Sequence, residues 1–191
     1  MTCPPENWVA IVSKRGDPHA LMAASALAKM GCVNHVIWSD QLADAGSFSW
    51  ELGCGWLAVA DSNGADLRLE GRGTIWWRRG ARQSNADHRS KAGILTSRNS
   101  AAALAGGMLC LPHVRVVDDP FLVSRAENKL IQLQAASEAG LRMPATLVSS
   151  NPSEIAGFAA RLGGGIVAKT LRHLPKMALE SVVIGTEELA D

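Results

Sequence analysis

The chain has 191 residues, of which 47% are hydrophobic, and a formal net charge of +1. This length suits one domain or two small ones with a packed core. The balanced charge excludes a strong overall attraction to nucleic acid or to a membrane surface.

No apolar run approaches the roughly 20 residues that span a bilayer. The first residues, MTCPPENW, lack the basic and apolar regions of a signal peptide. The four cysteines form no CxxC pair and the five histidines show no metal-ligand spacing, so we expect reduced thiols and no metal site among them. These residues are Cys3, Cys32, Cys54, Cys110, His19, His35, His88, His113 and His173. Together these features predict a cytoplasmic protein.

The first segment predicts a strand–helix–strand unit. The apolar run 8–13 is typical of a strand, and Asp17 and Pro18 are suited to the N-cap and first position of a helix that ends at Gly31. The run 32–38 predicts a second strand, parallel to the first and joined to it by a right-handed crossover. The connecting loop has one glycine and no GxGxxG, which favours a plain turn over a dinucleotide site.

Residues 47–61 predict a hairpin around Gly53-Cys54-Gly55, and residues 61–64 predict a further turn. Residues 73–79, GTIWWRR, predict a strand. Strand alternation would expose only one of the two adjacent tryptophans in it.

Seven Lys or Arg residues against one acid, Asp87, lie within 72–98. A run of this kind is usually a solvated helix face. An electropositive patch for an acidic peptide is the functional alternative. A nucleic-acid surface, using Trp76 and Trp77 for stacking, is the weakest of the three.

The segment 97–111 predicts a helix, and 113–120 predicts a strand that ends at Pro120, where we place a domain boundary. Ser124 is suited to the N-cap of the next helix, with Glu127 completing a capping box. That helix would present one face to a core and end at Gly140. The residues of that face are Ala126, Leu130, Leu133 and Ser137.

A strand is predicted for 145–149, followed by a helix that begins at Asn151-Pro152 and ends at Gly163. Residues 165–171, GIVAKTL, predict a strand in which Lys169 shares a face with Val167 and Leu171. The stretch 177–185 predicts a strand pairing with it. Residues 186–191 predict the first turn of a helix.

The stretch NKLIQLQAASEAGLRMPAT with IVAKTL resembles the start of the ATP-grasp domain of carboxylate–amine and carboxylate–alcohol ligases. The microviridin-type (graspetide) branch is the closer resemblance, and the ribosomal-protein glutamate ligases are more distant. The resemblance implies an α/β fold with a pre-ATP-grasp domain over 1–120 and the first lobe of an ATP-grasp domain over 121–191. It implies ATP contacts for Lys129 and Lys169, whose ammonium groups suit phosphate.

The strand with Arg78 and Arg79 is similar to one that ends the pre-ATP-grasp domain in these ligases, although Gly80 stands where proline is common. These two arginines are candidates for peptide-substrate binding. The family implies ATP and Mg²⁺, and an acidic precursor peptide as partner. Its magnesium ligands would lie beyond Asp191, so we expect this chain alone to be inactive. The alternative is a non-catalytic peptide-binding module, or a degenerate ATP-grasp fragment, that serves a partner ligase. For the oligomeric state, a homo-oligomer is compatible with the sequence.

Overall fold

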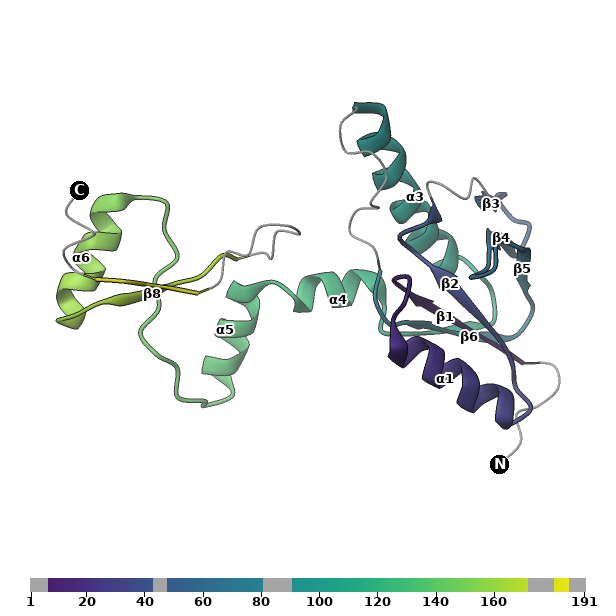
Figure 1. Ribbon diagram of the computed structural model, residues 1–191, viewed down its shortest axis with the longest axis horizontal. Coiled ribbons are helices and arrows are strands. Elements are labelled where there is room, and N and C mark those ends of the chain that lie inside the picture. The colour runs from purple at the N-terminus through teal and green to yellow at the C-terminus, as the bar shows by residue number, and fades with distance from the viewer. Residues whose placement is uncertain (1–6, 43–47, 81–90, 172–180, 186–191) are drawn as a thin grey trace. The chain divides into compact units, whose positions relative to one another are not determined.

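The computed structural model describes residues 7–42, 48–80, 91–171 and 181–185. The chain divides into two compact units, Met1–Val123 and Ser124–Asp191, and each is described by itself (Figure 1). The assignment of 1–120 to a pre-ATP-grasp domain and of 121–191 to a first lobe stays a prediction.

A parallel sheet forms the centre of the first unit. Its strand order is β2-β1-β6-β7, and all three strand pairs run parallel. The strands are β1 (Trp8–Ser13), β2 (Val33–Trp38), β6 (Gly73–Trp77) and β7 (Val114–Val117). The predicted strands and the parallel pairing of β1 with β2 are confirmed. The strand predicted over 73–79 is shorter, so Arg78 and Arg79 follow its end.

Helix α1 (Pro18–Lys29) connects β1 to β2. The Asp17 side chain accepts a hydrogen bond from the backbone N–H of His19, and Pro18 occupies the first turn, as predicted. Gly31 follows the helix with a φ of 73°, a conformation that glycine adopts without strain.

An antiparallel meander of β3 (Phe48–Trp50), β4 (Trp56–Ala60) and β5 (Asp66–Glu70) forms a second sheet. The first two strands confirm the predicted hairpin. Strand β5 was not predicted, although Leu67 and Leu69 alternate with polar residues and Leu69 is buried.

Helix α3 (Lys91–Leu109) begins before the predicted helix of 97–111. It covers one face of the parallel sheet together with the meander, and α1 covers the opposite face (Figure 1). Because the sheet is covered on both sides, β1 and the second half of β2 are almost continuously apolar. Part of the basic segment 72–98, residues 81–90, lies outside the described residues.

Two adjacent glycines of α3 are expected to respond oppositely to alanine. A Cβ at Gly106 would meet no atom within 4 Å, whereas a Cβ at Gly107 would lie 3.2 Å from both Leu57 and Phe48. Gly106→Ala should therefore raise the free energy of unfolding by about 0.5–1 kcal/mol, because alanine loses less backbone entropy. Gly107→Ala should not raise the free energy of unfolding in this way, because its Cβ would crowd Leu57 and Phe48. Urea unfolding of both variants measures the difference, and equal stabilisation would contradict it.

The helix start predicted at Ser124 is wrong. Helix α4 (Pro120–Ala126) contains Ser124, and α5 (Lys129–Glu138) begins after a break. Asp119 accepts hydrogen bonds from two backbone amides of the first turn of α4, and Asn128 caps α5. Two helix-start signals therefore act where one was predicted, and the continuous face from Ala126 to Ser137 does not form.

The strand predicted for 145–149 is also wrong, because no strand in the described part of the chain pairs with this stretch. Helix α6 (Pro152–Leu162) confirms the predicted cap at Asn151 and the predicted end at Gly163, which the structure shows in a left-handed conformation. Strand β8 (Ile166–Ala168) pairs antiparallel with β9 (Val182–Ile184), which confirms the pairing over these shorter ranges. The predicted turn of helix over 186–191 lies outside the described residues.

Candidate functional site

The two lysines predicted to contact ATP both lie in the second unit. Lys129 is the first residue of α5, is exposed, and donates a hydrogen bond from Nζ to Gln132 Oε1 at 3.0 Å. Lys169 follows the end of β8 and is also exposed. Val167 and Leu171, which share its predicted face, are 58% and 48% exposed. Neither amine is therefore held in a core, and their role toward ATP stays a prediction.

A groove of about 310 Å³ also lies within the second unit. It is lined by one side of α5 and by the extended residues 143–148. Its described lining includes neither lysine, so it does not join the two amines into one site.

A separate polar cluster lies at the carboxyl ends of the parallel strands in the first unit. The chain leaves β1 toward β2 on one side, whereas β6 lies on the other side of β1. The helices that follow, α1 and α3, cover opposite faces of the sheet. This arrangement is a topological switch point, the place where open parallel sheets commonly bind ligands.

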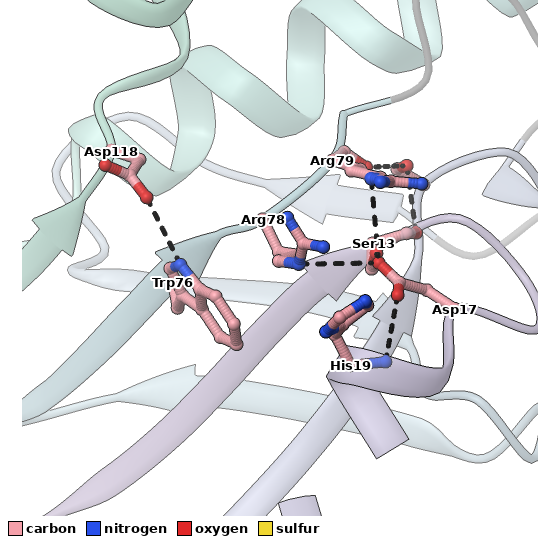
Figure 2. A network of polar contacts seen from close by, with 8 residues as sticks. Ser13, Asp17, His19, Trp76, Arg78, Arg79 and Asp118 are labelled. Carbon is pink, nitrogen blue, oxygen red and sulfur yellow. Dashed lines mark hydrogen bonds and ion pairs between the residues drawn. The ribbon is translucent and has the colours of Figure 1, made fainter. Parts of the chain in front are cut away.

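The Asp17 carboxylate is the buried centre of this cluster, with a side chain only 2% exposed (Figure 2). Its Oδ2 accepts a hydrogen bond from Ser13 Oγ at 2.6 Å, and its Oδ1 accepts one from the backbone N–H of His19 at 3.0 Å. The Nε atoms of Arg78 and Arg79 lie 3.6 Å and 3.9 Å from Oδ2. A buried carboxylate needs such partners, because an isolated buried charge is costly.

The backbone beneath the two arginines is fixed by the ends of three strands. The amides of Arg78 and Arg79 both donate to the Val12 carbonyl. The buried Ser39 hydroxyl lies within hydrogen-bond distance of the carbonyls of Ser13 and Arg79. The side chains differ in exposure, because Arg78 is 24% exposed and Arg79 is 57% exposed. The cluster thus presents two guanidinium groups on a rigid base.

Trp76 extends the cluster toward β7 (Figure 2). Its indole Nε1 donates to Asp118 Oδ2 at 3.2 Å, and the Arg78 guanidinium lies 5.8 Å from its ring centroid. Trp77 points into the core and is buried. A nucleic-acid surface that stacks bases on both tryptophans is therefore not formed.

Acid is expected to remove the stabilisation that Asp17 provides. The hydrogen bond from Ser13 is the largest cause that holds the pKa of Asp17 below its usual 3.8, with the His19 amide, Arg78 and Arg79 acting in the same direction and burial opposing them. Because the folded pKa is depressed, this stabilisation is present above the unfolded pKa and is lost as pH falls through the folded pKa.

The matched variant is Asp17→Asn, whose amide oxygen can still cap α1. Urea unfolding near pH 7 should find it less stable than the parent by about 1.5–3 kcal/mol, the scale of a charged hydrogen bond. The difference should shrink as the pH falls below about 4. A difference that is independent of pH would contradict the assignment.

Sequence reasoning found part of this cluster. It placed Asp17 at a helix start and Arg78 and Arg79 at a substrate site, but it did not bring the three residues together. The available signal was the parallel pairing, since parallel strands place their carboxyl ends at one edge. Among the described residues, no group of three His, Cys, Asp or Glu side chains could hold a metal ion. Cys32, Cys54 and Cys110, the described cysteines, are free thiols.

No family model matches the sequence, and no curated protein matches it. Solved structures do match. The macrocyclase MdnC of Microcystis aeruginosa MRC, bound with the precursor peptide MdnA, has a TM-score of 0.79 at 23% identity over 96% of this chain and 60% of that chain. The chain has the fold of an ATP-grasp ligase.

Two further ligases have the same fold. A RiPP-associated ATP-grasp ligase of Chryseobacterium gregarium, in complex with ADP and a leader and core peptide, has a TM-score of 0.73 at 19% identity over 96% of this chain and 58% of that chain. PsnB, complexed with a minimal precursor, Mg and ADP, has a TM-score of 0.68 at 16% identity over 95% and 59%. The predicted α/β fold is confirmed.

The chain therefore spans about 60% of the length of the solved ligases with this ATP-grasp fold. The activity, substrates and partners of a whole protein are accordingly matters of proposal. None of the described helices is both long enough and apolar enough to cross a membrane.

Proposed function

We propose that this chain is the amino-terminal portion of an ATP-dependent ligase that activates a carboxylate of a peptide. The observation that supports this proposal is the similarity, over almost the whole chain, to ligases solved with precursor peptides. ATP would supply the γ-phosphoryl group that converts the carboxylate into an acyl-phosphate, from which a hydroxyl or an amine displaces phosphate to form an ester or an amide. A cytoplasmic location is part of the same proposal.

Lys129 and Lys169 would bind phosphate oxygens of ATP. Both are exposed and lie in one unit, and an ammonium group is a compact point charge with three donors. The described residues do not fit a magnesium site, because they contain no cluster of three acidic or other metal-binding side chains. The ligands for Mg²⁺ would lie beyond Asp191.

Arg78 and Arg79 would bind the peptide. They belong to the first unit, at the carboxyl ends of β1 and β6. The alternative function is a peptide-binding module without catalysis, or a degenerate ATP-grasp fragment, that serves a partner ligase. A homo-oligomer is compatible with either function.

The test joins this chain to the protein encoded downstream of Asp191 and incubates it with ATP, Mg²⁺ and an acidic peptide. The ligase proposal expects ADP and a peptide lighter by one water for each bond formed, as read by mass spectrometry. Peptide binding without product would favour the binding module. Product from the 191-residue chain alone would contradict the placement of the magnesium ligands beyond Asp191.

A further inference from the structure

In the described part of the chain, the amides after β1 do not form the phosphate site that switch points of such sheets often have. In many parallel sheets an anion binds the free amides at the start of the helix after the first strand. Here the carboxylate of Asp17 takes that place and accepts from the His19 amide at 3.0 Å. Two more amides of the loop already donate hydrogen bonds within the protein. Arg15 N–H donates to the Asp40 carboxylate, and Asp17 N–H donates to the Lys14 carbonyl.

The two arginines provide donors of another kind. Their Nε atoms lie 3.6 Å and 3.9 Å from Asp17 Oδ2, and each guanidinium carries further N–H donors on its two Nη atoms. A guanidinium fork matches the two oxygens of a carboxylate in a planar, bidentate arrangement. Arg79 is more than half exposed and Arg78 is partly exposed, so an external group can reach both.

The charges of the cluster select the class of anion. Around Asp17, the two guanidinium groups and the one buried carboxylate sum to a formal charge of +1, which one added carboxylate neutralises. Asp118, hydrogen-bonded to Trp76, adds a further negative charge to the cluster and disfavours an anion of higher charge. A phosphate dianion would instead leave excess negative charge close to Asp17, which is buried in the same cluster. Like charges at such short range are unfavourable.

We propose that Arg78 and Arg79 bind one carboxylate side chain of an acidic peptide, and that Asp17 is the positioning residue that orients their guanidinium groups. This inference rests on the proposed function, because that function supplies the peptide. It adds which chemical group is recognised, where it is recognised, and through which buried residue.

Calorimetric titration of the 191-residue chain with a short all-glutamate peptide tests the site, with the all-glutamine peptide as the uncharged probe. Arg78→Gln and Arg79→Gln should each weaken binding of the all-glutamate peptide about tenfold or more, as expected for a charged hydrogen bond. Arg15→Gln is the matched control, since Arg15 is an exposed arginine of the nearby loop. It should change the affinity less than about twofold, and the all-glutamine peptide should bind far more weakly than the all-glutamate peptide.

Asp17→Asn separates positioning from simple electrostatics. If Asp17 acted only through its charge, its removal would strengthen the binding of an anion. If Asp17 orients the two arginines, Asp17→Asn weakens binding of the all-glutamate peptide, about tenfold, despite the gain in positive charge. Stronger binding by this variant would overturn the positioning role. A thermal unfolding curve for each variant shows that the protein under titration is folded.

Three further results of the titrations would each overturn part of this proposal. If the peptide binds and both arginine variants match the parent, this site is overturned while a peptide ligase stands. If the parent does not bind the all-glutamate peptide, the site is likewise overturned, and the ATP contacts of the lysines are tested independently. Arginine-dependent displacement of the peptide by inorganic phosphate at lower concentration would overturn the choice of a carboxylate.

Discussion

In the protein that carries the complete ATP-grasp fold, Lys169→Ala should weaken ATP binding by about 1.5–3 kcal/mol, or roughly 10- to 150-fold. Lys129→Ala should act similarly, because each variant would remove one charged hydrogen bond to phosphate. Neither change should affect the free energy of unfolding by more than about 0.5 kcal/mol, since both side chains are exposed. Isothermal titration with a non-hydrolysable ATP analogue measures the affinity.

Lys29→Ala is the matched control for the two lysines. Lys29 is an exposed lysine at the end of α1, in the other unit of the chain. It should leave the affinity for the analogue unchanged. Parent-like affinity in both Lys129→Ala and Lys169→Ala would remove these residues from the ATP site, and an equal loss in Lys29→Ala would indicate a general effect of charge.

Ile75→Ala should lower the free energy of unfolding of the first unit by about 2–5 kcal/mol. Ile75 is fully buried in β6, between the neighbouring strands β1 and β7, and belongs to the core that α3 and the meander cover. Removing its side chain takes apolar surface from the core and leaves a cavity. Close-packed surroundings relax only partly to fill such a cavity.

Urea unfolding followed by tryptophan fluorescence measures this loss. Leu52→Ala is the control, because Leu52 is 86% exposed near the tip of the hairpin and its truncation should cost less than about 0.5 kcal/mol. Similar midpoints for the two variants would contradict the placement of Ile75 in the core.

Local signals predicted the first unit well where several of them agreed. The run 8–13, the pair Asp17-Pro18 and the run 32–38 each have a backbone preference and a hydrophobic pattern that favour the same element. Strand β5 was missed because its five residues DLRLE are largely polar. Its pairing with β4 and the burial of Leu69 are what form it, and both are tertiary effects.

Residues 119–149 show where local signals compete. Asp119-Pro120 and Asn128 each begin a helix, whereas the capping box expected at Ser124 and Glu127 does not begin one. The apolar pattern of 145–149 favours a strand, but a strand also needs a partner edge, which the described chain does not give it.

The candidate site shows the same division between local and tertiary information. The basic segment and the resemblance of its strand to the ATP-grasp ligases pointed to Arg78 and Arg79, and helix-start rules pointed to Asp17. The distances of 3.6 Å and 3.9 Å between them depend on the placement of β6 beside β1, across a long stretch of sequence. Sequence periodicity contains no information on which distant strand becomes the neighbour.

The strand order affects when, during folding, Arg78 and Arg79 come to lie beside Asp17. Trp8 of β1 pairs with Val33 on one side and with Gly73 on the other. During synthesis β1 can pair with β2 early. The other edge of the apolar β1 stays unpaired until β6 has left the ribosome. Long-range parallel pairing is slow, and an unpaired strand edge is open to association with other chains. The backbone that positions Arg78 and Arg79 therefore forms late in folding, only when β1 has paired with β6.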